Sequence, residues 1–147
     1  MAFSLAAHAD SGELFQAKEN AQESALNFAR CSGVYAAVSE VHAATNSPAL
    51  AKTTKETSNG AWLASAYIMF STGIIPDWKK AMTYAENTAS SEKLSYMASF
   101  EKDADPNKAV GELTDAMKEC NKFGELQEKL VQEARIRLYS QNAEEER

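Results

Sequence analysis

The chain has 147 residues, the usual length of one domain and enough to bury roughly two thirds of its unfolded surface. Its 44% hydrophobic and 24% charged residues are typical of a soluble globular domain. The net charge is −6 and no run of Lys or Arg is longer than a pair, which argues against DNA or RNA as a partner. The longest apolar stretch, residues 61–75, contains Ser, Thr and Gly and is shorter than the roughly twenty residues that span a bilayer. We therefore expect a buried core helix there and no membrane-spanning segment.

Residues 1–9 are predicted to be the remnant of a signal peptide. Residues 2–7 are mostly apolar, and Ala7-His8-Ala9 places small residues where signal peptidase cuts. The basic residues that normally precede the apolar part are absent, which leaves three interpretations: a truncated signal peptide, a start chosen too late, or a chance match. Export would place the mature domain in the periplasm or outside the cell; without export, it would be cytoplasmic.

Four helices are predicted along the rest of the chain. The first covers residues 11–45, where Gly33 is the one interruption and no proline occurs. The second covers residues 48–72, and its second half is apolar on nearly every side, so it should be the most buried helical stretch. The third begins near Pro76. The fourth covers residues 106–139.

The predicted helix boundaries depend on a few residues with strong positional preferences. Ser47 and Asp105 are caps that precede Pro48 and Pro106, because proline is well tolerated in the first turn of a helix. Gly73 is a natural residue for the end of the second helix. These boundaries leave short connections between consecutive helices.

Short connections favour antiparallel neighbours. The sequence therefore predicts an all-α fold, an antiparallel up-down-up-down four-helix bundle with long first and last helices. We assign residues 10–140 to a single helical bundle domain. Residues 141–147 are rich in Glu and poor in apolar side chains, and are predicted to form a flexible acidic tail.

The two cysteines each lie on an apolar stripe of a predicted long helix. Cys31 lies fourteen residues before Thr45 and Cys120 fourteen residues after Pro106, so both are roughly 21 Å from the same end of the bundle. The first and last helices of such a bundle are adjacent, which makes a Cys31–Cys120 disulfide geometrically reasonable if the Cα atoms are about 4.4 to 6.8 Å apart. The alternative is two unpaired buried cysteines, as in many cytosolic proteins.

The sequence contains no recognisable catalytic or metal-binding motif. His8 belongs to the predicted signal-peptide remnant, which leaves His42 without a His-x-x-x-His or Glu-x-x-His partner. The two cysteines are too far apart in sequence to form a zinc or Cys-x-x-Cys redox pair. Nucleophile motifs are absent, and the acidic residues alternate with Lys on charged helix faces. We therefore predict neither an enzyme, nor a metal site, nor a bound cofactor.

Aromatic and aliphatic side chains gather around the predicted turn between the second and third helices. The set comprises Trp62, Tyr67, Phe70, Ile74, Ile75, Trp78 and Met82. The simpler interpretation is that they fill the core; the alternative is a pocket for an apolar ligand or a patch for a partner. Exposure of Ile74 and Ile75 would favour a partner. An enclosed cavity lined by Trp62, Tyr67 and Met82 would favour a ligand.

The segment Ala29-Arg-Cys-Ser-Gly-Val-Tyr35, together with the distant Cys120, resembles the cysteine helix of small exported α-helical proteins. Such proteins occur, uncharacterised, in proteobacteria and their phages, with one cysteine pair joining two helices. The resemblance covers one helix and implies no activity or site. We expect an exported helical interaction or accessory subunit of the cell envelope that binds another protein without catalysis. The alternative is a periplasmic carrier of an apolar small molecule held between helices.

Overall fold

The computed structural model of the protein describes residues 11–102 and 105–145, with side chains over residues 20–101 and 105–138. This part of the chain forms five helices and no strand, which confirms the all-α prediction. The helices are α1 (Ser11–Ala44), α2 (Pro48–Ser71), α3 (Trp78–Lys102), α4 (Pro106–Asn121) and α5 (Gly124–Glu145). The predicted signal-peptide remnant, residues 1–9, lies outside the described residues.

Most helix boundaries follow the predicted signals. Pro48 and Pro106 occupy first-turn positions, and the Asp105 carboxylate accepts a hydrogen bond from the Asn107 backbone N–H at 3.0 Å. Gly73 follows α2 with φ 75°, a left-handed conformation that glycine adopts without steric cost. Ser47 differs from the prediction, because its side chain makes no capping hydrogen bond.

The predicted fourth helix is in fact two helices, so a four-helix bundle is not confirmed. The chain turns at residues 122–123, where the Phe123 backbone N–H bonds to the Cys120 carbonyl at 3.0 Å, a spacing of three residues rather than four. α4 lies against α1, whereas α5 packs against α2. α5 extends to Glu145, beyond the predicted end near Tyr139. The flexibility of residues 141–147 stays a prediction.

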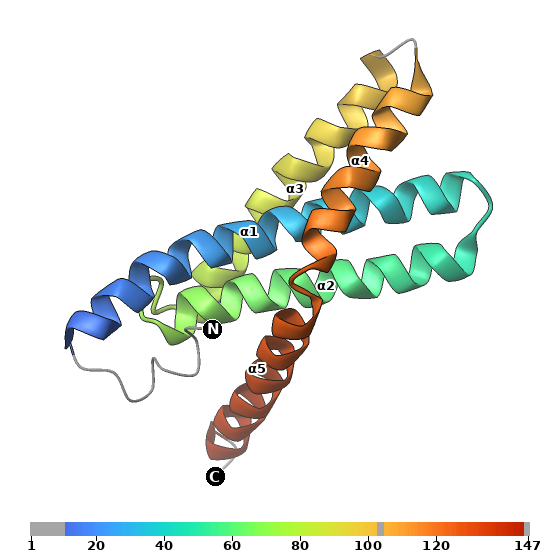
Figure 1. Ribbon diagram of the computed structural model, residues 1–147. Helices are drawn as coiled ribbons and strands as arrows, with labels where there is room; N and C mark the ends of the chain where they lie inside the picture. The colour runs from blue at the N-terminus through green and yellow to red at the C-terminus, as the bar shows by residue number, and fades with distance from the viewer. Residues whose placement is uncertain (1–10, 103–104, 146–147) are drawn as a thin grey trace.

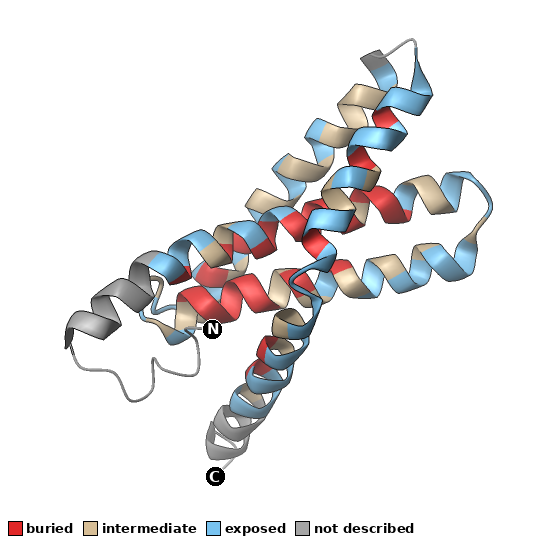
Figure 2. Ribbon diagram, in the orientation of Figure 1, coloured by how far each residue is buried: buried red, intermediate tan, exposed pale blue. Residues whose placement is uncertain are grey.

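The helices form two antiparallel pairs and a fifth arm (Figure 1). α1 and α2 run side by side as one long hairpin, and α3 and α4 form a second hairpin that crosses it at a steep angle. Figure 2 shows that the buried residues concentrate along the α1–α2 pair and where the other helices cross it. The tips of both hairpins are largely exposed.

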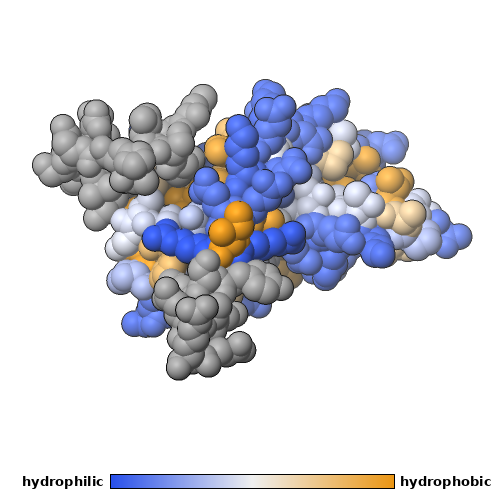
Figure 3. All heavy atoms as spheres, turned by 90° about the horizontal axis from the view of Figure 1, so that it is seen from below, coloured by the Kyte–Doolittle hydropathy of each residue, from blue (hydrophilic) through white to orange (hydrophobic). Residues whose placement is uncertain are grey.

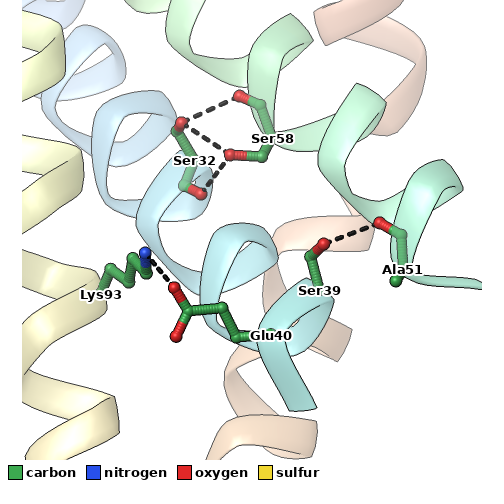
Figure 4. Close-up of polar contacts among 6 residues, drawn as sticks. All are labelled: Ser32, Ser39, Glu40, Ala51, Ser58 and Lys93. Atoms are coloured by element: carbon green, nitrogen blue, oxygen red, sulfur yellow. Dashed lines mark hydrogen bonds and ion pairs between the residues drawn. The ribbon is translucent and has the colours of Figure 1, made fainter. Parts of the chain in front are cut away.

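Small residues in a seven-residue register join α1 to α2. The Ser39 hydroxyl donates to the Ala51 carbonyl at 2.7 Å, and seven residues further along each helix Ser32 and Ser58 donate to each other's carbonyls at 2.8 and 2.7 Å (Figure 4). After another seven residues, the Ser65 hydroxyl donates to the Ala25 carbonyl at 2.6 Å. Helix separation depends on the side chains at the contact, so these small residues let the two backbones approach closely.

α3 crosses α1 at Gly33. A Cβ atom at this position would lie 2.8 Å from the Cβ of Glu92 and 2.9 Å from the backbone nitrogen of Lys93, so only glycine fits without a shift. At the same crossing, the Lys93 ammonium forms an ion pair with Glu40 of α1 (Figure 4). The glycine that interrupts the predicted first helix is thus the contact point between two helices.

Candidate functional site: the disulfide and the adjacent groove

Cys31 of α1 and Cys120 of α4 lie at disulfide distance. Their Cα atoms are 5.6 Å apart, inside the predicted range, and they are separated by 89 positions in sequence. Both cysteines are buried, with 7% and 8% of their surface exposed. The pairing predicted from matched heights along the first and last helices is confirmed, even though the helix that carries Cys120 is shorter than predicted.

An apolar cluster and one polar contact surround the cysteine pair. Val34, Val38 and Leu113 are buried beside it. One turn after Cys31, the Tyr35 hydroxyl donates a hydrogen bond to the Asn121 side-chain oxygen at 2.6 Å. Burial raises the pKa of Tyr35 above its ordinary value of 10.0, so this hydroxyl keeps its proton at neutral pH. The contact fixes the end of α4 directly after the cysteine.

Tyr96 on α3 packs at the edge of the same cluster. Its pKa is raised above 10.0 by burial and, to a smaller extent, by the negative charges of Glu92 and Glu112. A neutral phenol in this position is consistent with a structural role for the ring beside the disulfide.

A groove of about 600 Å³ lies next to the disulfide, between α1 and the junction of α4 with α5. Phe28 and Phe123 pack edge to face in it, with ring centres 6.2 Å apart. Phe28 is buried, whereas Phe123 is 42% exposed. The lining residues are Asn20, Glu23, Ser24, Asn27, Phe28, Lys122, Phe123, Glu125, Leu126 and Lys129.

This groove was not predicted, although the sequence contains a signal for it. Phe28 precedes Cys31 by three positions and Phe123 follows Cys120 by three positions. Residues three apart lie on one helix face, so a bridge between the cysteines brings the two phenylalanines together. The break before Gly124, which we did not predict, then directs α5 away and leaves Phe123 partly open to solvent.

The structure brings most of the predicted aromatic patch together near the α2–α3 turn, whereas Trp62 lies further back on α2, beside Arg135 of α5. Tyr67 is buried, and Phe70 packs edge to face on Trp78 with ring centres 5.6 Å apart. The remaining members are partly buried against the core made by α1, α2, α3 and α5: Trp62, Ile74, Ile75 and Met82. Ile74 and Ile75 are thus neither fully buried nor fully exposed. Whether the patch binds a ligand or a partner stays a prediction.

A second, smaller hollow lies where α5 crosses α2. Its volume is about 390 Å³, and its lining includes Trp62, Leu63 and Arg135. Neither Tyr67 nor Met82 belongs to the lining of this hollow or of the groove beside the disulfide. Of these two hollows, the groove beside the disulfide has the larger volume and the more extensive apolar lining.

Two further observations concern metal binding and membranes. Within the described ranges, no three His, Cys, Asp or Glu side chains are grouped so that they could hold a metal ion. None of the helices in the described part of the chain has both the length and the apolar content needed to cross a membrane.

Comparisons of the chain with protein-family models, curated proteins and solved structures found no match.

Proposed function

We propose that the protein is an exported, disulfide-fastened helical subunit of the cell envelope that acts by binding another protein. The observation that carries this proposal is the groove beside Cys31 and Cys120, where the ring of Phe123 is partly exposed over the buried ring of Phe28. Aromatic side chains in such settings are enriched at protein–protein contacts.

Export is supported by the cysteine pair. Disulfides persist in oxidising compartments such as the periplasm and the extracellular space, and are rare in the bacterial cytosol. Cys31 and Cys120 lie at disulfide distance inside an apolar cluster, which suits a permanent cross-link. We therefore place the protein in the periplasm or outside the cell.

The alternative is a carrier that holds an apolar small molecule between α2 and α3. It receives less support, because Phe70 already packs on Trp78 at this turn and Tyr67 is buried. Binding of another protein, by contrast, needs no rearrangement of the core, because the groove with Phe123 is already open to solvent.

The test uses the full-length gene expressed in its source organism. Intact mass after thiol alkylation without reductant should show two unmodified cysteines in the periplasmic or secreted fraction. A photo-crosslinking amino acid placed at exposed positions, including Phe123, Leu50 and Leu94, should form covalent adducts heavier than the monomer at one or more of them. Two alkylated thiols in the cytoplasmic fraction would contradict export, and the absence of adducts at every position would contradict the binding function.

A further inference from the structure

The groove beside the disulfide lies between two helical walls. Among the residues whose side chains the structure describes, the α1 wall includes positions from Asn20 to Phe28, and the other wall runs from Lys122 to Lys129, through the α4–α5 turn into α5. The described part of each wall spans about two helical turns. A partner helix lying along it would contribute two or three apolar side chains on one face.

The floor of the groove is apolar, and the groove opens to solvent. Phe28 is 3% exposed, so its ring is held in place by the surrounding core. Phe123 is 42% exposed, which leaves part of its ring for a partner to cover. Leu126 extends this surface by one turn of α5. In Figure 3, which views the molecule from below, apolar surface shows as small areas between hydrophilic ones. An open groove of this kind suits a helix, since small-molecule sites enclose most of the ligand's surface.

The two walls carry different charge. Among the described lining residues, the α1 wall carries the charge of Glu23, whereas the opposite wall has Lys122 and Lys129 with Glu125 between them, a net charge of +1. Lys122 also lies 2.9 Å from Glu119, but both side chains are exposed, and such pairs contribute little energy. A complementary partner would place cations toward Glu23 and carboxylates toward the two lysines.

We infer that this groove is the partner-binding surface, and that it receives a short amphipathic helix with basic residues on one flank and acidic residues on the other. This inference rests on the proposed binding function and names the surface that performs it. The disulfide holds the two walls together, because Cys31 and Cys120 each lie one turn from a phenylalanine of the floor.

Two synthetic helical peptides test the inference on the oxidised full chain at about 0.15 M salt. Both carry leucines at positions i, i+3, i+4 and i+7. The first has lysines on one flank and glutamates on the other, and the second has lysines on both flanks. We expect the mixed peptide to bind about tenfold more tightly, measured by calorimetry. Binding of the mixed peptide should change the NMR chemical shifts of the protein most strongly around Phe28, Phe123 and Leu126.

Three variants sharpen the test. Lys122→Glu combined with Lys129→Glu makes both walls acidic, so the preference should reverse in favour of the all-lysine peptide. Phe123→Ser should lower the affinity for both peptides about tenfold or more, because a central aromatic contact is lost. Leu94→Ser is the matched control, since Leu94 is 66% exposed on α3, outside the groove, and its loss should leave both affinities unchanged.

Several results would overturn the inference. These are the absence of binding by either peptide, equal loss of affinity in Phe123→Ser and Leu94→Ser, or shift changes centred on Ile74 and Ile75. Self-association of the protein that Phe123→Ser abolishes would assign the groove to a second copy instead. Crosslinks in cells at positions other than Phe123, together with no peptide binding, would show that the groove is not the binding surface. The proposed binding function would then still stand.

Discussion

At the scale of single residues, Gly33 determines how closely α3 approaches α1. Because a Cβ at this position would meet Glu92 and the backbone of α3, Gly33→Ala must push the two helices apart. We expect the free energy of unfolding to fall by about 1 to 3 kcal/mol, the usual cost of overpacking. Urea denaturation followed by circular dichroism measures this change.

Gly111→Ala is the matched control, because a Cβ there meets no atom within 4 Å. This substitution should stabilise the protein by about 0.5 to 1 kcal/mol, since alanine loses less backbone entropy than glycine in a helix. If Gly33→Ala were as stable as Gly111→Ala, the close crossing of α1 and α3 would be wrong.

The sequence distinguishes these two glycines poorly. Both interrupt a helical pattern, and helix propensity assigns them the same cost. What separates them is the position of α3, which is a tertiary feature. The cysteines are different, because the predicted end of the first helix near Thr45 and the predicted start of the last helix at Pro106 were enough to place them. Counted from these two positions, Cys31 and Cys120 lie at the same distance from one end of the bundle. Residues whose role depends on distance along their own helix could be predicted, and those whose role depends on a crossing helix could not.

At the scale of helices, the reciprocal bonds between Ser32 and Ser58 hold α1 and α2 in register. Each hydroxyl donates to the other residue's carbonyl, and the two hydroxyl oxygens are 3.2 Å apart. We expect Ser32→Ala and Ser58→Ala each to lower the free energy of unfolding by about 1 kcal/mol. A double-mutant cycle should show a coupling of about 0.5 kcal/mol or more, because both bonds belong to one contact.

Thr83→Ala controls for the loss of a hydroxyl group. The Thr83 hydroxyl is exposed and bonds only within its own helix, to the Lys79 carbonyl, so its removal should be nearly neutral. Strict additivity of the two serine substitutions in urea denaturation would contradict a shared interhelical contact.

The separation of α4 from α5 shows where helix prediction fails. The apolar period of Leu113, Met117 and Cys120 continues unchanged through Phe123 and beyond, so the pattern predicts one helix. In the structure, contacts on both sides of the break fix the chain: Asn121 accepts the Tyr35 hydrogen bond, and Phe123 packs on Phe28. The partners in these contacts are residues of α1, so the sequence around the break contains no sign of it apart from Gly124. The spacing of Phe28 and Phe123 about the cysteines could predict their contact, but the groove also depends on this break, which the pattern does not predict.

At the scale of the whole molecule, α4 and α5 are attached to the α1–α2 pair in different ways. α4 is fastened at its C-terminal end by the cysteine pair, whereas α5 buries Leu130 and Ala134 in the main core. The Gln127 side chain also donates to the Thr57 carbonyl of α2 at 3.0 Å. α3 buries Ala81 and Ala85 in the same core, so within the α3–α4 hairpin it is α4 whose position depends more heavily on the cross-link, and its first turn near the tip is largely exposed (Figure 2).

The cross-link should contribute a large part of the stability. A bridge between positions 89 residues apart removes chain entropy from the unfolded state worth about 4 kcal/mol, against a typical total of about 5 to 15 kcal/mol. We expect Cys31→Ser combined with Cys120→Ser to lower the free energy of unfolding by about this amount in urea denaturation. Wild-type protein with reductant should match the double variant, and reductant should leave the double variant unchanged. Hydrogen exchange should accelerate more in α4 than in α2, because α4, unlike α2, loses a covalent attachment. Equal stability of oxidised and reduced wild-type protein would show that packing alone holds α4 on α1.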